Sequence, residues 1–368
     1  MPRRSKVAVI IPDYLPISQT FNYLELIRLT KVLPILCTVR TSNLDRFPFE
    51  QTYLYKNIDD LKKVLHKQKA DLIHARFGTT GLGILGVKKE LDLPMLTSFH
   101  GYDLPSNRRL IGYKNNHIQR LFEEGDAFTA TSQNMKEILI KYGCPENKIF
   151  VHHSGIDIQR FTFKKRIMPW NKFITLLSVG RLVEKKGMRY LIDAFRKAHE
   201  RYPFLRLRIV GDGHLRNMIG KQVRKLNLED KVRFLGALPH QEVAKEMNKA
   251  DLFALASITD STGNQEGIPN VLKEAMASGL PVVSTWHAGI PELVEDGKSG
   301  FLVPERDSNA LAQRILDLIH LSNQWGEMGK RGRKIVMDSF NVETQIEELE
   351  RIYFNILQEK TTSRLRQN

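Results

Sequence analysis

Several features that identify other protein classes are scarce or missing in this 368-residue sequence. Cys37 and Cys144 are its only cysteines, too few for a disulfide framework, and this indicates a reducing compartment. No apolar stretch approaches the roughly 20 residues that a membrane-spanning helix needs. The basic N-terminus resembles the start of a signal peptide, but the apolar run at 7–11 ends at Pro12-Asp13 and is too short. These features predict a cytoplasmic protein.

The sequence also lacks the patterns of nucleic-acid binding. Its net charge of +15 could attract nucleic acid, but there is no Cys/His finger and no basic strand pattern with interleaved aromatic residues. No nucleic-acid partner is therefore expected. Basic clusters at 62–69, 108–114 and 164–166 leave two alternatives open. One is a solvated surface, and the other is peripheral binding to an anionic membrane, at the inner face of the plasma membrane.

Strand-like and helix-like segments alternate along most of the chain. Amphipathic stretches such as 58–68, 135–142 and 187–201 separate short apolar runs. The runs that we predict to be strands are residues 7–11, 35–39, 71–75, 95–99, 127–131, 149–152, 174–179, 205–210, 232–235, 252–256 and 282–285. This alternation predicts an α/β protein with two Rossmann-like, doubly wound parallel sheets, each with helices on both faces.

The two runs of alternation predict two domains and a linker. The segment 161–172 is basic and contains Pro169, and we interpret it as the linker between domains 1–165 and 166–340. Residues 341–357 are expected to form a closing helix, and the polar tail 358–368 is expected to be frayed. Ligands of such sheets bind beyond the carboxyl ends of the strands, so two facing sheets would form a cleft.

Three glycine motifs resemble phosphate-binding loops. The glycines at 81, 83 and 86 fit the dinucleotide spacing, but the first strand of the domain ends without a glycine run, which favours close helix packing. Gly297-Lys298-Ser299 reads as a surface turn, because Glu292 stands where a nucleotide-triphosphate loop needs glycine. Gly211-Asp212-Gly213 is a sharp turn after a strand, and both turn chemistry alone and a ligand role stay open for it.

A phosphate site is better supported at 178–187. A strand ends at Val179, Gly180 permits a close backbone approach, and Arg181 and Lys186 follow at the carboxyl end of the sheet. A planar guanidinium and a mobile ammonium suit a diphosphate, although ordinary surface cations would look similar. A second helix starts at 267–270, where the free amides and the helix dipole attract anions. Both lie at carboxyl ends of strands, so they can converge on one diphosphate.

Two glutamates stand beside this second helix start. Glu266 precedes the helix, with Pro269 at its expected first position, and Glu274 follows in its second turn. Because they would repel phosphate, we assign them to the hydroxylated ends of the same ligand, where a carboxylate can accept two hydroxyl hydrogen bonds. The ligand is then a nucleotide sugar. Glu274 could also be an ordinary helix charge, but the neighbouring Ala275 and Met276 indicate a buried flank.

These motifs together resemble the retaining glycosyltransferases of family four, which have the GT-B fold of two Rossmann-like domains facing a cleft. The resemblance spans nearly the whole chain. Its C-terminal marks are Gly180-Arg181, Lys186-Gly187, the Glu266/Glu274 pair around Gly267-Ile268-Pro269, and the stretch 281–292. Its N-terminal marks are Phe99-His100-Gly101-Tyr102-Asp103 and the stretch 153–157.

Within this family the chain is similar to enzymes that build bacterial exopolysaccharide or other envelope glycans. Ser18-Gln19-Thr20-Phe21 resembles a Ser-Glu-Thr-Phe motif that some of them carry after the first strand. Gln19 replaces that glutamate, and Ala288-Gly289 replaces a more usual Gly-Gly pair. Both departures bear on acceptor preference and not on the reaction.

The resemblance implies a role for each candidate residue. Arg181 and Lys186 would neutralise the leaving diphosphate, Glu266 would contact the sugar, and His100 would lie near the donor sugar and the acceptor. His100 could also be a packed histidine at a strand end. The catalytic residues are therefore expected to be Glu266, His100, Arg181 and Lys186. Donor binding is expected to involve Glu274, at the ribose diol, together with Gly267, Ile268, Asn270, Gly180 and Asp212.

The expected activity is metal-independent transfer, with retention, of a sugar from a nucleotide-sugar donor to a glycan or lipid-linked acceptor. A UDP-sugar is favoured over a GDP-sugar. No Asp-x-Asp pair occurs in the chain, so no divalent metal and no other cofactor is expected. The family also implies that domain 1–165 binds the acceptor, that 166–340 binds the donor and that the closing helix crosses back to the first domain. A nucleotide-sugar epimerase of the same fold, and transfer to a small-molecule acceptor, stay open as alternatives.

Overall fold

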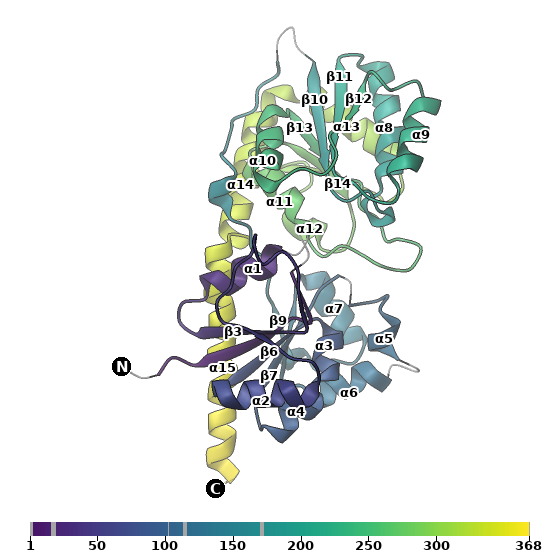
Figure 1. The fold of residues 1–368 in the computed structure, drawn as a ribbon. Helices are drawn as coiled ribbons and strands as arrows, with labels where there is room; N and C mark the ends of the chain where they lie inside the picture. Colours follow the sequence, from purple (N-terminus) through teal and green to yellow (C-terminus); the bar gives the residue numbers. More distant parts are fainter. Residues whose placement is uncertain (1–2, 16–19, 102, 113–115, 170–172, 368) are drawn as a thin grey trace. The chain divides into compact units, whose positions relative to one another are not determined.

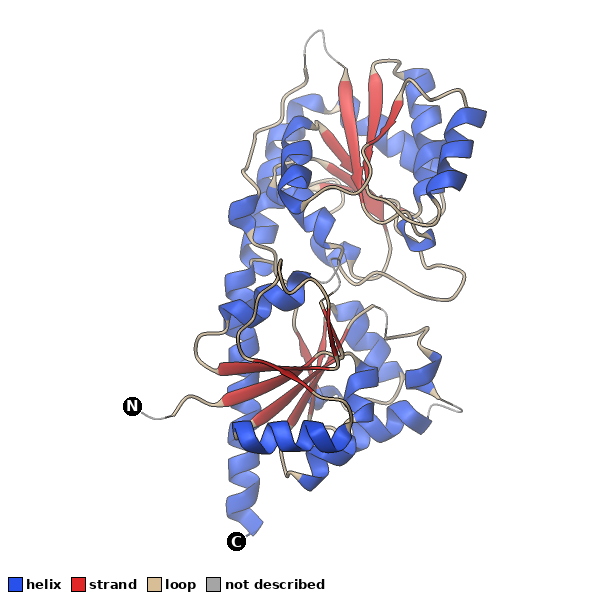
Figure 2. Cartoon of the chain, in the orientation of Figure 1, coloured by secondary structure: helices blue, strands red, loops and turns tan. Residues whose placement is uncertain are grey.

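The computed structural model describes residues 3–15, 20–101, 103–112, 116–169 and 173–367. The chain divides into two compact units, which Figures 1 and 2 show as separate sheets with their own helices. Unit 1 comprises Met1–Gly155 and Val342–Asn368, and unit 2 comprises Ile156–Asn341. Each unit is described below by itself.

Unit 1 is built on a seven-stranded sheet in the order β5-β3-β1-β6-β7-β8-β9, in which every neighbouring pair is parallel. The chain therefore winds outward from β1 in both directions, which is the doubly wound arrangement that the sequence predicted. The strands are β1 (Lys6–Ile10), β3 (Leu33–Thr38), β5 (Thr52–Leu54), β6 (Leu72–Arg76), β7 (Met95–Phe99), β8 (Ala127–Ala130) and β9 (Ile149–Val151). A separate short pair joins β2 (Asp13–Tyr14) to β4 (Arg40–Thr41).

Helices cover both faces of the sheet of unit 1, and apolar side chains form a core on each face. On one face, Leu61 and Leu65 of α2 pack in a cluster with Ile73 and Phe99 of the strands. On the other face, the last helix contributes Ile352 and its neighbours. The helices are α1 (Thr20–Arg28), α2 (Ile58–Gln68), α3 (Gly78–Gly83), α4 (Leu85–Glu90), α5 (Arg108–Ile111), α6 (Asn116–Glu124), α7 (Gln133–Lys141) and α15 (Val342–Gln367).

Only one of the three glycines at 81–86 shows the close packing that the sequence predicted. A Cβ on Gly81 would lie 2.6 Å from the Thr97 hydroxyl, so this position needs glycine. A Cβ on Gly83 or Gly86 would meet no atom within 4 Å. The dinucleotide spacing is therefore a packing contact at its first position and carries no steric requirement at the other two.

Unit 2 repeats the same winding with six strands in the order β12-β11-β10-β13-β14-β15, again all parallel. The strands are β10 (Ile174–Val179), β11 (Leu205–Val210), β12 (Val232–Phe234), β13 (Leu252–Ala254), β14 (Val282–Thr285) and β15 (Gly300–Val303). The helices are α8 (Met188–Arg201), α9 (Arg216–Lys225), α10 (His240–Lys249), α11 (Asn270–Ala277), α12 (Ile290–Leu293), α13 (Ser308–His320) and α14 (Trp325–Ser339). The winding changes direction between β10 and β13, and ligands of such sheets bind at that point.

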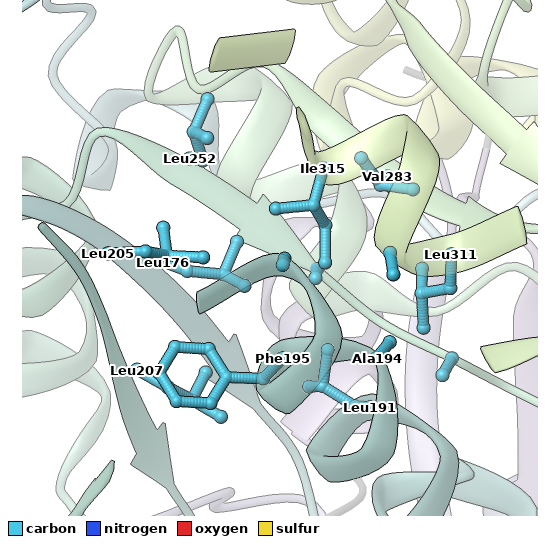
Figure 3. Close-up of a cluster of buried hydrophobic side chains, with 14 of the residues drawn as sticks. Leu176, Leu191, Ala194, Phe195, Leu205, Leu207, Leu252, Val283, Leu311 and Ile315 are labelled. Carbon is cyan, nitrogen blue, oxygen red and sulfur yellow. The ribbon is translucent and has the colours of Figure 1, made fainter. Parts of the chain in front are cut away.

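Alternate residues of β10 enter two different cores. Leu176 faces the cluster in Figure 3, together with Leu191 and Phe195 of α8 and Ile315 of α13. Leu177 faces the opposite cluster, which contains residues of α10, α11 and α14. Because both faces are covered, most strands of unit 2 are short and largely apolar, and all of them except β15 were readable from the sequence.

The chain enters unit 2 at Ile156, before the predicted boundary at 165/166, and the predicted linker 161–172 is partly core. Phe161 is buried among residues of unit 2. Arg166 is also buried, and its guanidinium donates to the carbonyl oxygens of Met247, Asn248, Ala250 and Ser278 at 2.9 to 3.1 Å. The basic composition of this segment was misread, because one of its cations satisfies buried backbone groups and does not face solvent. Residues 170–172 lie outside the described part.

The C-terminal helix is longer than predicted, since α15 continues through the tail that was expected to be frayed. Its last turns are held to unit 1 by ion pairs of Lys360 and Arg364 with Asp92. Arg364 Nη2 also donates to the Asp92 carbonyl at 3.2 Å. A polar composition therefore did not mean fraying here. Over the part of the chain that the structure covers, no helix has the length and apolar character to span a bilayer.

Candidate active site

The predicted donor residues gather at the carboxyl end of the sheet of unit 2, around β10 and the loops after β11 and β13. Gly180 follows β10, and Gly211 follows β11. A Cβ on Gly211 would lie 1.9 Å from the Gly180 carbonyl oxygen, so the two turns touch through their backbones. The Leu182 amide donates to the Asp212 carbonyl at 2.9 Å, which fixes the two turns together. Arg181 and Asp212 are both exposed beside this junction.

A glycine also fixes the turn that carries Lys185 and Lys186, directly before α8. Gly187 has φ of +60°, and a Cβ there would lie 1.7 Å from the Ala256 carbonyl oxygen. Only glycine can therefore bring this turn, which carries Lys185 and Lys186, against the strand end of β13. Backbone packing therefore brings the two lysines to the loop after β13.

Glu266 and Lys186, which the sequence assigned to different parts of the donor, form an ion pair with Oε2 to Nζ at 3.2 Å. Lys185 Nζ lies 3.7 Å from Glu266 Oε1. Burial alone would raise the pKa of Glu266, but Lys186 and Lys185 outweigh it and hold this pKa below its ordinary value. The carboxylate is therefore ionised at neutral pH. Its Oε1 is buried and has no hydrogen-bond donor among the described residues.

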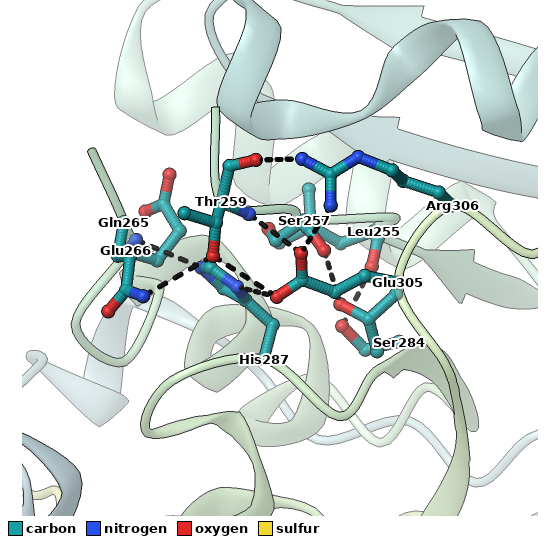
Figure 4. Close-up of polar contacts among 10 residues, drawn as sticks. Leu255, Ser257, Thr259, Gln265, Glu266, Ser284, His287, Glu305 and Arg306 are labelled. Carbon is teal, nitrogen blue, oxygen red and sulfur yellow. Dashed lines mark hydrogen bonds and ion pairs between the residues drawn. The ribbon is translucent and has the colours of Figure 1, made fainter. Parts of the chain in front are cut away.

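The loop that carries Glu266 runs from Thr259 and is held at both ends, as Figure 4 shows. At one end, the Glu266 amide donates to His287 Nε2 at 3.0 Å. His287 Nδ1 lies 2.6 Å from Glu305 Oε1. At the other end, the Thr259 amide donates to Glu305 Oε2 at 2.9 Å. Glu184 accepts from the amide and hydroxyl of Ser261, so the middle of the loop is tied as well.

Glu274 lies in the second turn of α11, is 6% exposed, and binds a histidine that the sequence did not indicate. His240 Nε2 lies 2.9 Å from Glu274 Oε1, and the His240 ring packs edge-on against Phe161. The hydrogen bond with Glu274 raises the pKa of His240 despite partial burial. A cavity of about 450 Å³ adjoins His240 and is lined by Arg160, His240, Gln241, Ala244, Lys245 and Asn248.

The start of α11 offers backbone amides to a ligand. Pro269 is the residue before the first turn, one position earlier than predicted, and no side chain caps the helix. Ile268 is buried in the core, so only its backbone can face a donor. The Asn270 Oδ1 atom accepts a hydrogen bond from Lys273 Nζ at 3.1 Å. The free backbone amides at the start of α11, with that of Gly267, form the positive end of the helix dipole, which follows Glu266 in the chain.

His100, the remaining predicted catalytic residue, belongs to unit 1 and lies after β7. Its ring stands between those of Phe21 and Phe77, with centroid distances of 5.2 and 5.0 Å. The His100 Nε2 atom is buried and has no hydrogen-bond partner within the described ranges. Burial, reinforced by the Arg76 charge, lowers the pKa of His100 well below its ordinary value, so the imidazole is neutral at pH 7.

The motif around His100 is held by a buried carboxyl group. Asp103 accepts from the amides of His100 at 2.8 Å and Gly78 at 3.0 Å. Burial raises the pKa of Asp103 to about 7 against the effect of these two bonds. Tyr102 lies outside the described residues, as do Ser18 and Gln19 of the Ser-Gln-Thr-Phe motif.

Sequence reasoning missed Lys185, His240, His287 and Glu305. The partners of His240 and His287 lie 18 to 34 positions away in the sequence, so no short motif reveals them. Lys185 was visible beside Lys186, but its hydrogen bonds to Asn264 Oδ1 and the Gln265 carbonyl depend on the loop fold. Within the described ranges, no group of three or more His, Cys, Asp and Glu side chains is placed to hold a metal ion.

Comparison with known proteins shows which family this chain is similar to. The profile of group 1 glycosyl transferases matches residues 160–335, and that of glycosyltransferase family 4 matches 16–160. WcaL of Escherichia coli K12, assigned as a colanic acid biosynthesis glycosyltransferase, is 39% identical over 277 residues, which cover 74% of this chain and 68% of WcaL. The chain belongs to the family 4 glycosyltransferases. It is a glycosyltransferase with the GT-B fold, as the motifs predicted.

Two further proteins extend this comparison. The amylovoran biosynthesis glycosyltransferase AmsK of Erwinia amylovora is 38% identical over 251 residues, which cover 68% of this chain and 61% of AmsK. The crystal structure of Alr3699/HepE of Anabaena in complex with UDP-glucose matches with a TM-score of 0.78, at 20% identity, over 95% of this chain and 99% of HepE. The second match concerns the fold alone.

Proposed function

We propose that this protein is a retaining hexosyltransferase that moves a sugar from a nucleotide-sugar donor to a hydroxyl of a glycan or lipid-linked acceptor in polysaccharide or cell-envelope synthesis. A UDP-sugar is the preferred donor, ahead of a GDP-sugar. One observation carries the proposal. Glu266, paired with Lys186 at 3.2 Å, keeps a buried Oε1 without a hydrogen bond within the described residues, beside the uncapped start of α11.

That arrangement fits a diphosphate joined to a sugar. Lys186 and the amides at the start of α11 would neutralise the diphosphate, with Arg181 exposed at the same edge of the sheet. Glu266 Oε1 would accept a sugar hydroxyl, which satisfies its open hydrogen-bonding position. Glu274 would exchange its contact with His240 for the ribose diol. WcaL and AmsK support a role in polysaccharide synthesis, and HepE supports a UDP-sugar donor.

The reaction breaks the bond between the sugar C1 atom and the diphosphate oxygen and forms a bond from C1 to the acceptor oxygen on the same face. The proton of the acceptor hydroxyl passes to the leaving diphosphate oxygen. Fixed cations at Arg181 and Lys186 stabilise the charge that develops on this oxygen. We assign to His100, which is neutral and keeps a buried Nε2 atom without a partner in the described ranges, the role of a hydrogen-bond acceptor toward the acceptor hydroxyl.

A panel of UDP- and GDP-sugars tests the proposal, with thermal stabilisation as the first readout. A ligand at 100 times its Kd adds about 2.7 kcal/mol of stability, which is easily measured. The donors that stabilise the protein are then incubated with glycan and lipid-linked acceptors, and the anomeric configuration of the product is read by NMR. Inversion would contradict the proposed mechanism. Conversion of the free nucleotide sugar without an acceptor would identify the epimerase alternative.

Metal independence is a separate part of the proposal. Because Arg181, Lys186 and the start of α11 supply positive charge, we expect turnover to stay within about twofold in saturating chelator. Initial rates with and without EDTA measure this. Loss of turnover that magnesium or manganese restores would show that the fixed cations are not sufficient.

We also propose that the exposed face of α2 binds anionic lipid. Lys63, Lys67 and Lys69 are exposed there, and the Lys63 side chain is 79% exposed. Each such lysine near an anionic surface adds about 1 kcal/mol of attraction, which salt screens. The fraction of protein that sediments with phosphatidylglycerol vesicles should therefore fall steeply as the salt concentration rises. Equal binding to neutral phosphatidylcholine vesicles would exclude this role.

A further inference from the structure

We propose that His287 and Glu305 act as a pair of positioning residues that hold both ends of the loop 259–266 and so place Glu266 for transfer. The pair is not among the residues that we propose to contact the donor. The inference rests on the proposed function, in which Glu266 contacts the transferred sugar. It adds two residues to which the sequence analysis gave no role, His287 within the stretch 281–292 and Glu305 beyond it.

The hydrogen bonds fix the protonation of His287. The Glu266 amide can only donate, so His287 Nε2, 3.0 Å away, must accept and carries no proton. The proton of the neutral ring is then on Nδ1, where it is donated to Glu305 Oε1 at 2.6 Å. The side chain of His287 is fully buried, so water does not compete for either bond. Glu305 thus keeps the proton of His287 on Nδ1, and this leaves Nε2 able to accept the hydrogen bond from the Glu266 amide.

Glu305 also holds the other end of the loop. Its Oε2 accepts from the Thr259 amide at 2.9 Å, and its Oε1 lies 3.4 Å from the Thr259 hydroxyl. Two side chains therefore bind the first and the last backbone amides of an eight-residue segment, as Figure 4 shows. A continuous series of hydrogen bonds runs from Glu266 through His287 and Glu305 to Thr259, and the backbone of the loop joins its two ends.

The two residues come from rigid elements next to the loop. His287 lies two residues after β14, and Glu305 lies two residues after β15, which pairs with β14 in register from Val282↔Gly300 to Thr285↔Val303. Neighbouring parallel strands end at the same edge of a sheet, so their registry brings the imidazole and the carboxylate together. Glu266 is thus fixed twice, at its amide by His287 and at its carboxylate by Lys186.

Such a double constraint has a consequence for rate. A reacting group must stay within a fraction of an ångström of its working position, and a displacement of about 1 Å can lower a rate about 10²-fold. If the amide of Glu266 loses its acceptor, the carboxylate stays charged and paired with Lys186, but the backbone that carries it is released. Donor affinity should then change little while kcat falls.

Two substitutions of His287 separate this role from simple core packing. In His287→Gln, the side-chain oxygen stands near the position of Nε2 and can still accept from the Glu266 amide. In His287→Asn, the side-chain NH₂ stands near Nδ1 and can donate to Glu305, but the acceptor for Glu266 is lost. Both replace the ring by an uncharged amide, so a merely structural role would make both harmful. His320→Asn, at an exposed histidine of α13, is the matched control.

We expect His287→Asn to lower kcat about tenfold or more with donor KM within about twofold, and His287→Gln to stay within about threefold of the unmodified protein. Amide hydrogen exchange gives a readout that does not need activity. Exchange in the peptide that carries Glu266 should be about tenfold faster in His287→Asn than in His287→Gln, and Glu305→Gln should accelerate exchange at Thr259, because one carbonyl oxygen cannot serve both donors.

Equal effects of the two His287 variants on kcat and on exchange, whether both large or both absent, would overturn the proposal. So would a change confined to thermal stability. If the unmodified protein transfers no sugar, the proposed function fails, but the exchange rates still decide whether His287 and Glu305 hold the loop.

Discussion

The sheets of units 1 and 2 wind in the same order, with one more strand in unit 1, but the residues after β7 and after β10 differ in chemistry. In unit 2, the groups after β10 and β13 are charged and paired within the unit, as Lys186 is with Glu266. In unit 1, the histidine after β7 is neutral, lies between two aromatic rings, and keeps a buried Nε2 atom without a partner in the described part of the chain. Winding order alone therefore does not assign a role to either sheet.

The contrast is what the proposed function requires of one scaffold that serves two substrates. A donor with a diphosphate needs fixed positive charge that is already in place when the bond breaks. An acceptor hydroxyl is neutral and needs only a hydrogen-bonding atom in a dry site. The order of strands provides the edge at which ligands bind, and the few residues after each strand decide which ligand it is. The predictions below would sharpen or remove this distinction.

Glu266→Gln should have the largest effect. The substitution keeps the size of the side chain but removes the charge that faces Lys186 and the sugar, and we expect kcat to fall about 10²-fold or more. Donor affinity should change little, which isothermal titration with the donor measures beside steady-state kinetics. A loss of affinity as large as the loss of kcat would mean that Glu266 only binds the donor.

Glu274→Ala should affect binding more than rate. In the proposed donor site this carboxylate binds the ribose, remote from the bond that breaks, so its contribution should be similar in the ground state and the transition state. We expect donor KM to rise about tenfold and kcat to fall by a smaller factor. Circular dichroism must first show that the variant folds, because Glu274 is 6% exposed. A pattern opposite to that of Glu266→Gln supports the assignment of ends, and an identical pattern contradicts it.

Asp103 of unit 1 and Lys273 of unit 2 should contribute to the pH dependence of stability with opposite signs. Burial raises the pKa of Asp103 in unit 1 to about 7, so between about pH 4 and 7 the folded unit binds a proton that the unfolded chain has lost. The Asp103 contribution to the stability of unit 1 falls as pH rises through this window. The buried His74, His100 and His152, whose pKa values burial lowers, contribute with the opposite sign. Burial lowers the pKa of Lys273 in unit 2 to about 7, so between about pH 7 and 10.5 the unfolded chain holds the extra proton. The stability of unit 2 rises with pH in that window.

The slope for each group is at most about 1.4 kcal/mol per pH unit. Urea unfolding, followed by hydrogen exchange in core peptides of each unit, measures it. Asp103→Asn should remove the falling contribution from the acidic window of unit 1 and leave that of its histidines, and Lys273→Met should remove the rising contribution from the alkaline window of unit 2. Unchanged slopes in these variants would show that other groups carry the pH dependence.

The sequence was most informative where a functional or structural unit is contiguous. β7, β10, β11 and β14 begin and end at the predicted residues, because buried parallel strands are short apolar runs between turns. The edge strands β5 and β15 were not predicted. Gly300 opens β15 close to Val282 of β14, and this close approach becomes visible only once the strands are paired.

The candidate site shows the same division. Gly180, Arg181, Lys186, Glu266 and Glu274 were identified from local motifs, and the structure places all five in unit 2. Their partners could not be found in this way. The contact of His240 with Glu274 spans 34 positions and that of Glu266 with His287 spans 21, and both depend on which strands become neighbours. Local motifs indicate the groups that we propose to contact a ligand. The residues that position these groups come together only in the tertiary fold.

The helix α15 has a consequence for synthesis of the chain. It supplies Ile346, Leu349, Ile352, Tyr353 and Ile356 to the core of unit 1, yet it follows all of unit 2 in the sequence. Domains usually fold as units, the N-terminal one first, as they leave the ribosome. Here the first 155 residues emerge without the helix that covers one face of their sheet, whereas unit 2 is continuous from Ile156 to Asn341. Unit 2 is translated second but is therefore the first unit whose core can be completed. Until α15 is synthesised, the sheet of unit 1 lacks the helix that packs on one of its apolar faces.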